Sequence, residues 1–131
     1  VLSLPPDVQE RMEQLGLAFQ AEFLGRSDAR HPENVEVLAE LATVLTRLGR
    51  FEEGLAADQR LAALAPEDPT VHYNLACSLA LLGRLEPALD TLERALALGY
   101  VDLAHLLSDP DLANLKEAPR FRALTQRLRE R

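Results

Sequence analysis

The 131-residue sequence has one cysteine, no tryptophan and only 5% aromatic residues. A single cysteine excludes an internal disulfide, so the fold does not depend on an oxidising compartment and a cytoplasmic location is the default expectation. No apolar run approaches the ~20 residues of a membrane-spanning helix, which argues against membrane insertion. The sequence begins at Val1 without an initiator Met, and the segment before Asp7 is too short for a signal peptide. This predicts a processed product or a piece of a longer protein. The length of 131 residues predicts one domain. Because aromatic residues are few, we expect its core to consist of Leu and Ala.

The net charge of −7 argues against a nucleic-acid binder, because such proteins need a basic surface. The charge is uneven, however: from Lys116 onward there are six basic residues and only two acidic ones, Glu117 and Glu130. One interpretation of this tail is a solvated last helix whose arginines complement its own dipole. The alternative is a docking strip for an acidic partner or for another copy of the chain.

The sequence contains a repeat with a period of 34 residues. Gly49 returns as Gly83, and the residues around it return at the same interval: Leu41 as Leu75, Ala42 as Ala76, Leu45 as Leu79, Leu48 as Leu82, Arg50 as Arg84, Leu55 as Leu89 and Leu64 as Leu98. A fixed period of about 34 residues is typical of stacked helix-turn-helix units, none of which buries its apolar face alone.

The first helix is expected to open at Leu4-Pro5-Pro6-Asp7 and to be ended by Gly25 and the polar stretch Arg26-Ser27-Asp28-Ala29-Arg30. One apolar stripe follows it at steps of three and four: Val8, Met12, Leu15, Phe19 and Phe23. We expect this helix to form an end layer that turns a polar face outward.

Caps and glycines divide the remaining chain into helices. Asn34 caps a helix that Gly49 closes, and Asp68-Pro69 opens another that Gly83 closes. Further helices are expected over 51–64, 85–98 and 101–107, followed by a turn or two from Asp109-Pro110 and a last helix from Pro119. No segment alternates like a strand, so the fold class is all-α.

These residues resemble the tetratricopeptide repeat (TPR) family. The positions that carry the resemblance are Leu38, Leu41, Ala42, Leu45, Gly49, Phe51, Gly54 and Pro66 in residues 35–68, and His72, Leu75, Ala76, Leu79, Gly83, Leu85, Ala88, Leu92 and Ala95 in residues 69–102. His72 departs from the large apolar residue of the pattern, and Tyr100 stands where proline is expected.

The resemblance implies an α-α superhelix with two clear repeats, 35–68 and 69–102. Residues 1–34 would form an N-terminal helix or degenerate repeat. Residues 103–131 would form a C-terminal cap, because Asp109-Pro110-Asp111-Leu112 and Ala118-Pro119-Arg120-Phe121 are similar to the closing segment of many bacterial TPR proteins.

The resemblance also implies a non-catalytic scaffold that binds a peptide or protein in a concave groove. The groove positions would be Glu36, Ala39, Glu40, Thr43 and Arg47 in one unit, and Tyr73, Asn74, Cys77 and Leu81 in the next. Tyr73 and Cys77 have an alternative role in packing between helices. Some members of the family bind a peptide C-terminal carboxylate with lysine, asparagine and arginine at fixed groove positions. Here Ala39, Thr43, Tyr73 and Cys77 occupy those positions and only Asn74 and Arg47 could contribute, which argues against a receptor for a chaperone tail.

No motif predicts catalysis, a cofactor or a metal. A cysteine nucleophile needs a nearby base, and His72 lies five residues before Cys77, well round the same helix. His72 and His105 without convergent carboxylates would make a poor metal site. The glycines punctuate helices instead of forming a phosphate loop.

Two further hypotheses stay open beside the interaction scaffold. The chain could be a regulatory or targeting domain of a larger enzyme, or a self-associating module whose basic tail meets the acidic body of another copy, as a homo-oligomer.

Two repeats bury too little surface to stand alone, and about three are needed. Deleting residues 1–26 or residues 119–131 is therefore expected to lower the melting temperature sharply, as thermal unfolding by circular dichroism would show. A truncated chain that melts like its parent would contradict the capping role.

Overall fold

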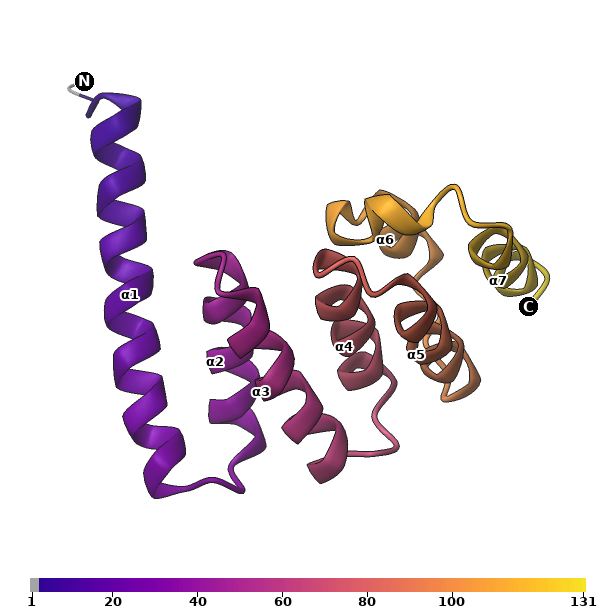
Figure 1. The fold of residues 1–131 in the computed structure, drawn as a ribbon, viewed down its shortest axis with the longest axis horizontal. Helices are drawn as coiled ribbons and strands as arrows, with labels where there is room; N and C mark the ends of the chain where they lie inside the picture. The colour runs from indigo at the N-terminus through magenta and orange to yellow at the C-terminus, as the bar shows by residue number, and fades with distance from the viewer. Residues whose placement is uncertain (1–2) are drawn as a thin grey trace. The chain divides into compact units, whose positions relative to one another are not determined.

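The computed structural model describes residues 3–131, and within them every regular element is helical (Figure 1). Val1 and Leu2 lie outside the described residues. The elements are α1 (Pro6–Arg30), α2 (Val35–Arg47), α3 (Phe51–Leu64), α4 (Pro69–Leu81), α5 (Leu85–Ala97), α6 (Leu103–Ser108), the 3-10 helix η1 (Pro110–Leu115) and α7 (Pro119–Arg129). The all-α class is thus confirmed. None of these helices has the length and apolarity needed to cross a membrane.

The caps expected from the sequence are present. The Asn34 side chain accepts hydrogen bonds from the backbone N–H groups of Glu36 and Val37 and so starts α2. Asp68 caps α4 in the same way. Gly49 and Gly83 follow α2 and α4 with φ of 78° and 73°, a left-handed conformation that favours glycine.

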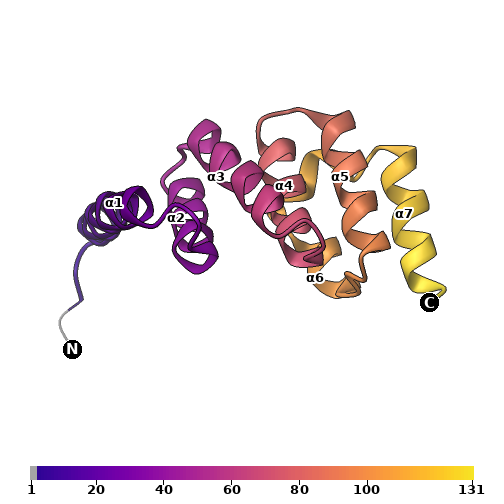
Figure 2. The same cartoon turned by 90° about the horizontal axis from the view of Figure 1, so that it is seen from below.

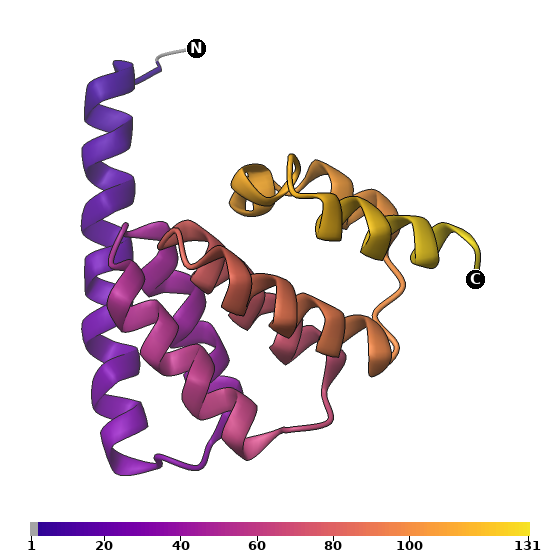
Figure 3. The same cartoon turned by 45° about the vertical axis from the view of Figure 1, so that its right-hand side comes forward.

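The chain forms two compact units, Val1–Ala57 and Asp58–Arg131, and the boundary falls inside α3. In the first unit α1 packs along α2, and its N-terminal end projects past α2 (Figures 1 and 3). α1 is 25 residues long and α2 only 13, which leaves part of α1 without a neighbour in this unit.

Two expectations about α1 are wrong. The helix does not end near Gly25 but continues to Arg30, because one glycine costs a helix only about 1 kcal/mol and good helix formers surround it. Nor does the outer face of α1 become polar: Met12, Leu15 and Phe19 are 57%, 71% and 71% exposed. Leu17 and Ala21 are the apolar residues that α1 buries instead.

In the second unit α4 and α5 pack as a hairpin, η1 lies against α4, and α7 lies against α5 (Figure 2). The core of this unit is leucine and alanine with two aromatic rings, as the composition predicts. Its fully buried members include Ala76, Ala88, Leu89, Leu92, Ala95, Leu106, Leu112, Leu115 and Leu124.

Part of the basic tail is paired inside its own unit. Arg120 lies 2.6 Å from Asp90 and 3.4 Å from Glu86, both on α5. Arg127 lies 3.1 Å from Glu93 on the same helix. Two of the four arginines of α7, Arg120 and Arg127, therefore pair with carboxylates of α5.

A buried carboxylate joins α3 to α4 within the second unit. Asp58 is 5% exposed and accepts a short hydrogen bond from the Ser78 hydroxyl. Burial raises the pKa of Asp58 to about 6, although the Ser78 hydrogen bond acts in the opposite direction.

This raised pKa predicts that the stability of the fold depends on pH. Because the folded pKa lies above that of the unfolded chain, the free energy of unfolding falls as pH rises from about 4 to about 6 and stays reduced above it. Asp58→Asn removes the ionisation, so its stability relative to the parent should rise over this window by up to about 3 kcal/mol. Urea unfolding at pH 4 and pH 7 measures this. The exposed Glu67→Gln is the control, and an equal shift in both variants would contradict the role of Asp58.

Candidate interaction surfaces

The exposed face of α2 carries the groove residues expected for the first unit. The helix buries Leu38, Leu41 and Leu45 at the spacing of one face. The opposite face exposes five side chains, Glu36, Ala39, Glu40, Thr43 and Arg47. All five side chains therefore lie at the surface of α2. That they bind a partner stays a prediction.

Not all five are equally available. The Arg47 guanidinium lies 3.2 Å from the Glu13 carboxylate on α1, and the Thr43 hydroxyl donates to the Ala39 carbonyl oxygen. Among residues 3–131, neither Glu36 nor Glu40 forms an ion pair. Two unpaired carboxylates one helical turn apart are therefore the most available charges on this face.

On α4 the structure separates the expected groove residues. Asn74 is exposed and Leu81 half-buried, but Tyr73 and Cys77 are only 2% and 6% exposed. Tyr73 and Cys77 therefore do not line an open surface, and their alternative role in packing is the one observed. The reason is that the segment after α5 folds back onto the face of α4 that carries them.

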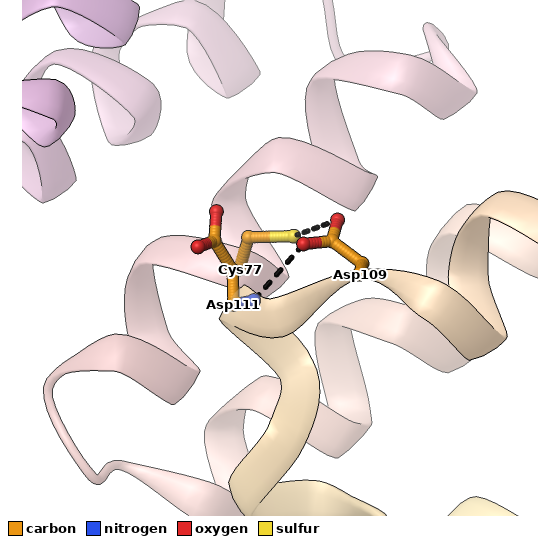
Figure 4. Close-up of side chains that lie close together, drawn as sticks. All are labelled: Cys77, Asp109 and Asp111. Atoms are coloured by element: carbon orange, nitrogen blue, oxygen red, sulfur yellow. Dashed lines mark hydrogen bonds between the residues drawn. The ribbon is translucent and has the colours of Figure 1, made fainter.

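Tyr73 and Cys77 instead hold the C-terminal segment. The Tyr73 hydroxyl donates a 2.7 Å hydrogen bond to Asp109 Oδ2. The Cys77 thiol donates to the same oxygen at 3.7 Å, as Figure 4 shows. Asp109 Oδ1 accepts from the Asp111 backbone N–H at 3.0 Å and so caps η1. One buried carboxylate thus starts η1 and fixes it against α4.

Aromatic rings close this cluster. The rings of Tyr73 and Tyr100 stack with centroids 4.3 Å apart and an interplanar angle of 1°. His105 Nε2 lies 3.4 Å from Asp109 Oδ2. Tyr100, which departs from the repeat pattern, therefore stands at its position as a stacking partner for Tyr73.

The environment of Cys77 suppresses the reactivity of its thiol. Burial raises the pKa of Cys77 well above its usual value, and the charges of Asp109 and Asp111 raise it further. The thiol therefore stays protonated at neutral pH, which disfavours it as a nucleophile. His72, the base considered from the sequence, is engaged with the Pro66 carbonyl oxygen at 2.8 Å.

The same three side chains are the nearest approach to a metal site. Within residues 3–131, Cys77, Asp109 and Asp111 bring ligand atoms within 4.8 Å of one another (Figure 4). Both oxygens of Asp109 already accept hydrogen bonds from the protein. The cluster is thus held by its own donors, and its evident role is to anchor η1.

The sequence had already indicated Asp109 as the start of a turn, but not its contacts with α4. The Asp109-Pro110 pair predicts a helix start, because aspartate caps and proline fits the first turn. A second contact, from Asn114 Nδ2 to the Ala80 carbonyl oxygen at 2.6 Å, had no signal in the sequence. Both depend on how η1 lies against α4.

Tyr73→Phe is expected to destabilise the protein by about 1.5 to 3 kcal/mol, because Asp109 loses a buried hydrogen-bond donor. Urea unfolding at pH 7 would measure the loss. Tyr100→Phe is the matched control, since it keeps the ring stack and removes no donor to Asp109. Equal stability of the two variants would contradict the anchoring role of the hydroxyl.

Comparison with known proteins supports the fold. Neither the family models nor the curated proteins include a match to the chain. A solved structure named MamA MSR-1 C2, a TPR-containing protein, matches with a TM-score of 0.65 and 24% sequence identity, over 88% of this chain and 68% of that chain. At this identity the likeness concerns the fold, and it agrees with the helices and caps described above. The chain therefore has the α-α superhelical repeat fold of TPR proteins.

Proposed function

We propose that this protein is a non-catalytic interaction module that binds a peptide or protein segment along the exposed face of α2. The observation that carries the proposal is the row of five exposed side chains on a helix whose opposite face is packed. A regular row on a rigid helix offers contacts at fixed spacing to an extended or helical segment. The TPR-like fold supports a protein partner as well.

The charges on α2 indicate the chemistry of the partner. Within the described part of the chain Glu36 and Glu40 form no ion pair, whereas Arg47 pairs with Glu13. A segment rich in Lys and Arg would pair with these carboxylates, and the net charge of −7 would favour its approach. We therefore propose a basic peptide segment as the ligand.

The buried polar groups favour binding over catalysis. The candidate nucleophile Cys77 is buried with a raised pKa, and its neighbours serve to hold η1. We propose that residues 35–68 and 69–102 act as the repeats and that 1–34 and 103–131 act as the end segments. A lone buried cysteine suits a reducing compartment, so we place the module in the cytoplasm.

The charge-reversal variant Glu36→Lys/Glu40→Lys tests the proposal. Fluorescence anisotropy would measure binding of a labelled 12-residue Lys-rich peptide, with neutral and Glu-rich peptides of the same length for comparison. We expect the parent to prefer the Lys-rich peptide and the variant to lose at least tenfold in affinity, because attraction becomes repulsion. Binding of the parent should weaken as salt rises.

A second double variant makes the same change of charge away from α2. Glu67→Lys/Glu117→Lys reverses two exposed carboxylates in the second unit. If it weakened binding as much as the α2 variant, net charge alone would explain the effect. A parent that showed no preference among the three peptides would refute the proposed ligand.

A further inference from the structure

The outer face of α1 is apolar although it has no partner in its unit. Met12, Leu15, Phe19 and Phe23, here called the outer stripe, are 57%, 71%, 71% and 61% exposed. Phe19 and Phe23 each follow an inward residue, Leu17 and Ala21, by two positions, which places them about 200° round the helix. α1 therefore has two apolar faces, and only one of them is packed within the unit.

The outer stripe has the spacing of a helix-pairing surface. Its members follow one another at steps of three, four and four residues, as in the seam of paired helices. Single exposed apolar residues are ordinary on a protein surface, whereas a contiguous patch of this kind marks an interaction site.

The charges beside the outer stripe are arranged in a complementary way. Arg11 and Glu22 lie eleven residues apart, which is about three turns and places both on the same flank of the helix. Asp7 lies near that flank at one end of the helix, and Arg26 lies at the other end. The side chains of Glu22 and Arg26 are 64% and 70% exposed, and they pair with each other along the helix.

We infer that the outer stripe binds the outer stripe of a second copy of this chain, with the two α1 helices antiparallel. In antiparallel pairs each flank of a helix faces the same flank of its partner. With Leu15 opposite Phe19 of the other copy, Arg11 lies beside Glu22 of that copy and Arg26 beside Asp7. Two-fold symmetry repeats both pairs.

The alternative orientation lacks these charge pairs. In a parallel pair each flank faces the opposite flank of its partner, so Arg11 and Glu22, which lie on one flank, would not meet. The centre of the antiparallel pair falls among residues 16–18, where Gly16 and Ala18 are exposed and small. Nothing lies within 4 Å of a side chain built at Gly16, so a second helix has room to approach.

The inference is independent of peptide binding at α2, because the two surfaces use different helices. It also differs from self-association through the basic tail, whose Arg120 and Arg127 are already paired with α5.

Sedimentation velocity over a concentration series of the full 131-residue chain would test pairing through the outer stripe. We expect a dimer whose dissociation constant rises at least 100-fold in Phe19→Glu, because a charge would then lie inside the apolar contact.

Gln20→Glu is the matched control, since it adds the same charge one position away and off the stripe. It should dimerise like the parent, and circular dichroism should show equal helix content in all variants. The monomeric Phe19→Glu variant should still bind the Lys-rich peptide if the α2 proposal holds. A parent chain that dimerises but does not bind the Lys-rich peptide would contradict the α2 proposal and leave the inference about α1 standing.

Charge reversal tests the antiparallel arrangement directly. Arg11→Glu and Glu22→Arg should each weaken the dimer about tenfold, because each places like charges side by side in both symmetric pairs. The double variant restores opposite charges and should recover the affinity of the parent. A parent that stays monomeric at every concentration would overturn the inference. A dimer that survives Phe19→Glu, or a double variant weaker than either single one, would overturn it too.

Discussion

Contacts between residues 34 positions apart recur within each of the two units. Glu13 pairs with Arg47 at 3.2 Å in the first unit, and Glu93 pairs with Arg127 at 3.1 Å in the second. Asn114 donates to the carbonyl oxygen of Ala80 across the same interval. A hairpin of two helices with its turns uses about 34 residues, so each residue meets its counterpart in the next layer. The rest of the fold follows from this spacing, since the apolar faces meet only when it is kept.

The C-terminal end of the second unit is fixed by a buried carboxylate as well as by packed leucines. Asp109 brings a charge into a buried place and is held there by Tyr73, Cys77 and the start of η1. A buried carboxylate without donors would be costly, whereas one with several donors specifies a single arrangement. This explains why Tyr73 and Cys77, placed by the repeat pattern at groove positions, belong to the core. The surface available to a partner is correspondingly smaller on α4 than on α2.

The first unit ends differently. α1 packs one apolar face against α2 and presents a second to its surroundings, so no single polar face marks the outside of the helix. A terminal layer normally stops a stack by turning a polar face outward. An apolar outer face leaves the stack able to continue, and pairing with another copy is one symmetric way to close it. The proposed peptide surface on α2 and the proposed pairing surface on α1 lie on different helices.

The sequence by itself determined the helical content, most helix boundaries and the caps, because these depend on neighbours in the chain. Asn34, Asp68, Gly49 and Gly83 act through backbone groups a few residues away, which sequence spacing reveals. The continuation of α1 past Gly25 was missed, since one glycine is a weak signal against a long helix.

Only the tertiary structure decided which faces are covered. The outer stripe looks in sequence like a packing face, and Tyr73 looks like a groove residue, yet their exposures are the reverse. The pairing of Arg120 and Arg127 in the basic tail with carboxylates of α5 was likewise not indicated by the sequence. The physical reason is that periodicity shows which side chains share a face of a helix. What lies against that face depends on segments far away in the chain.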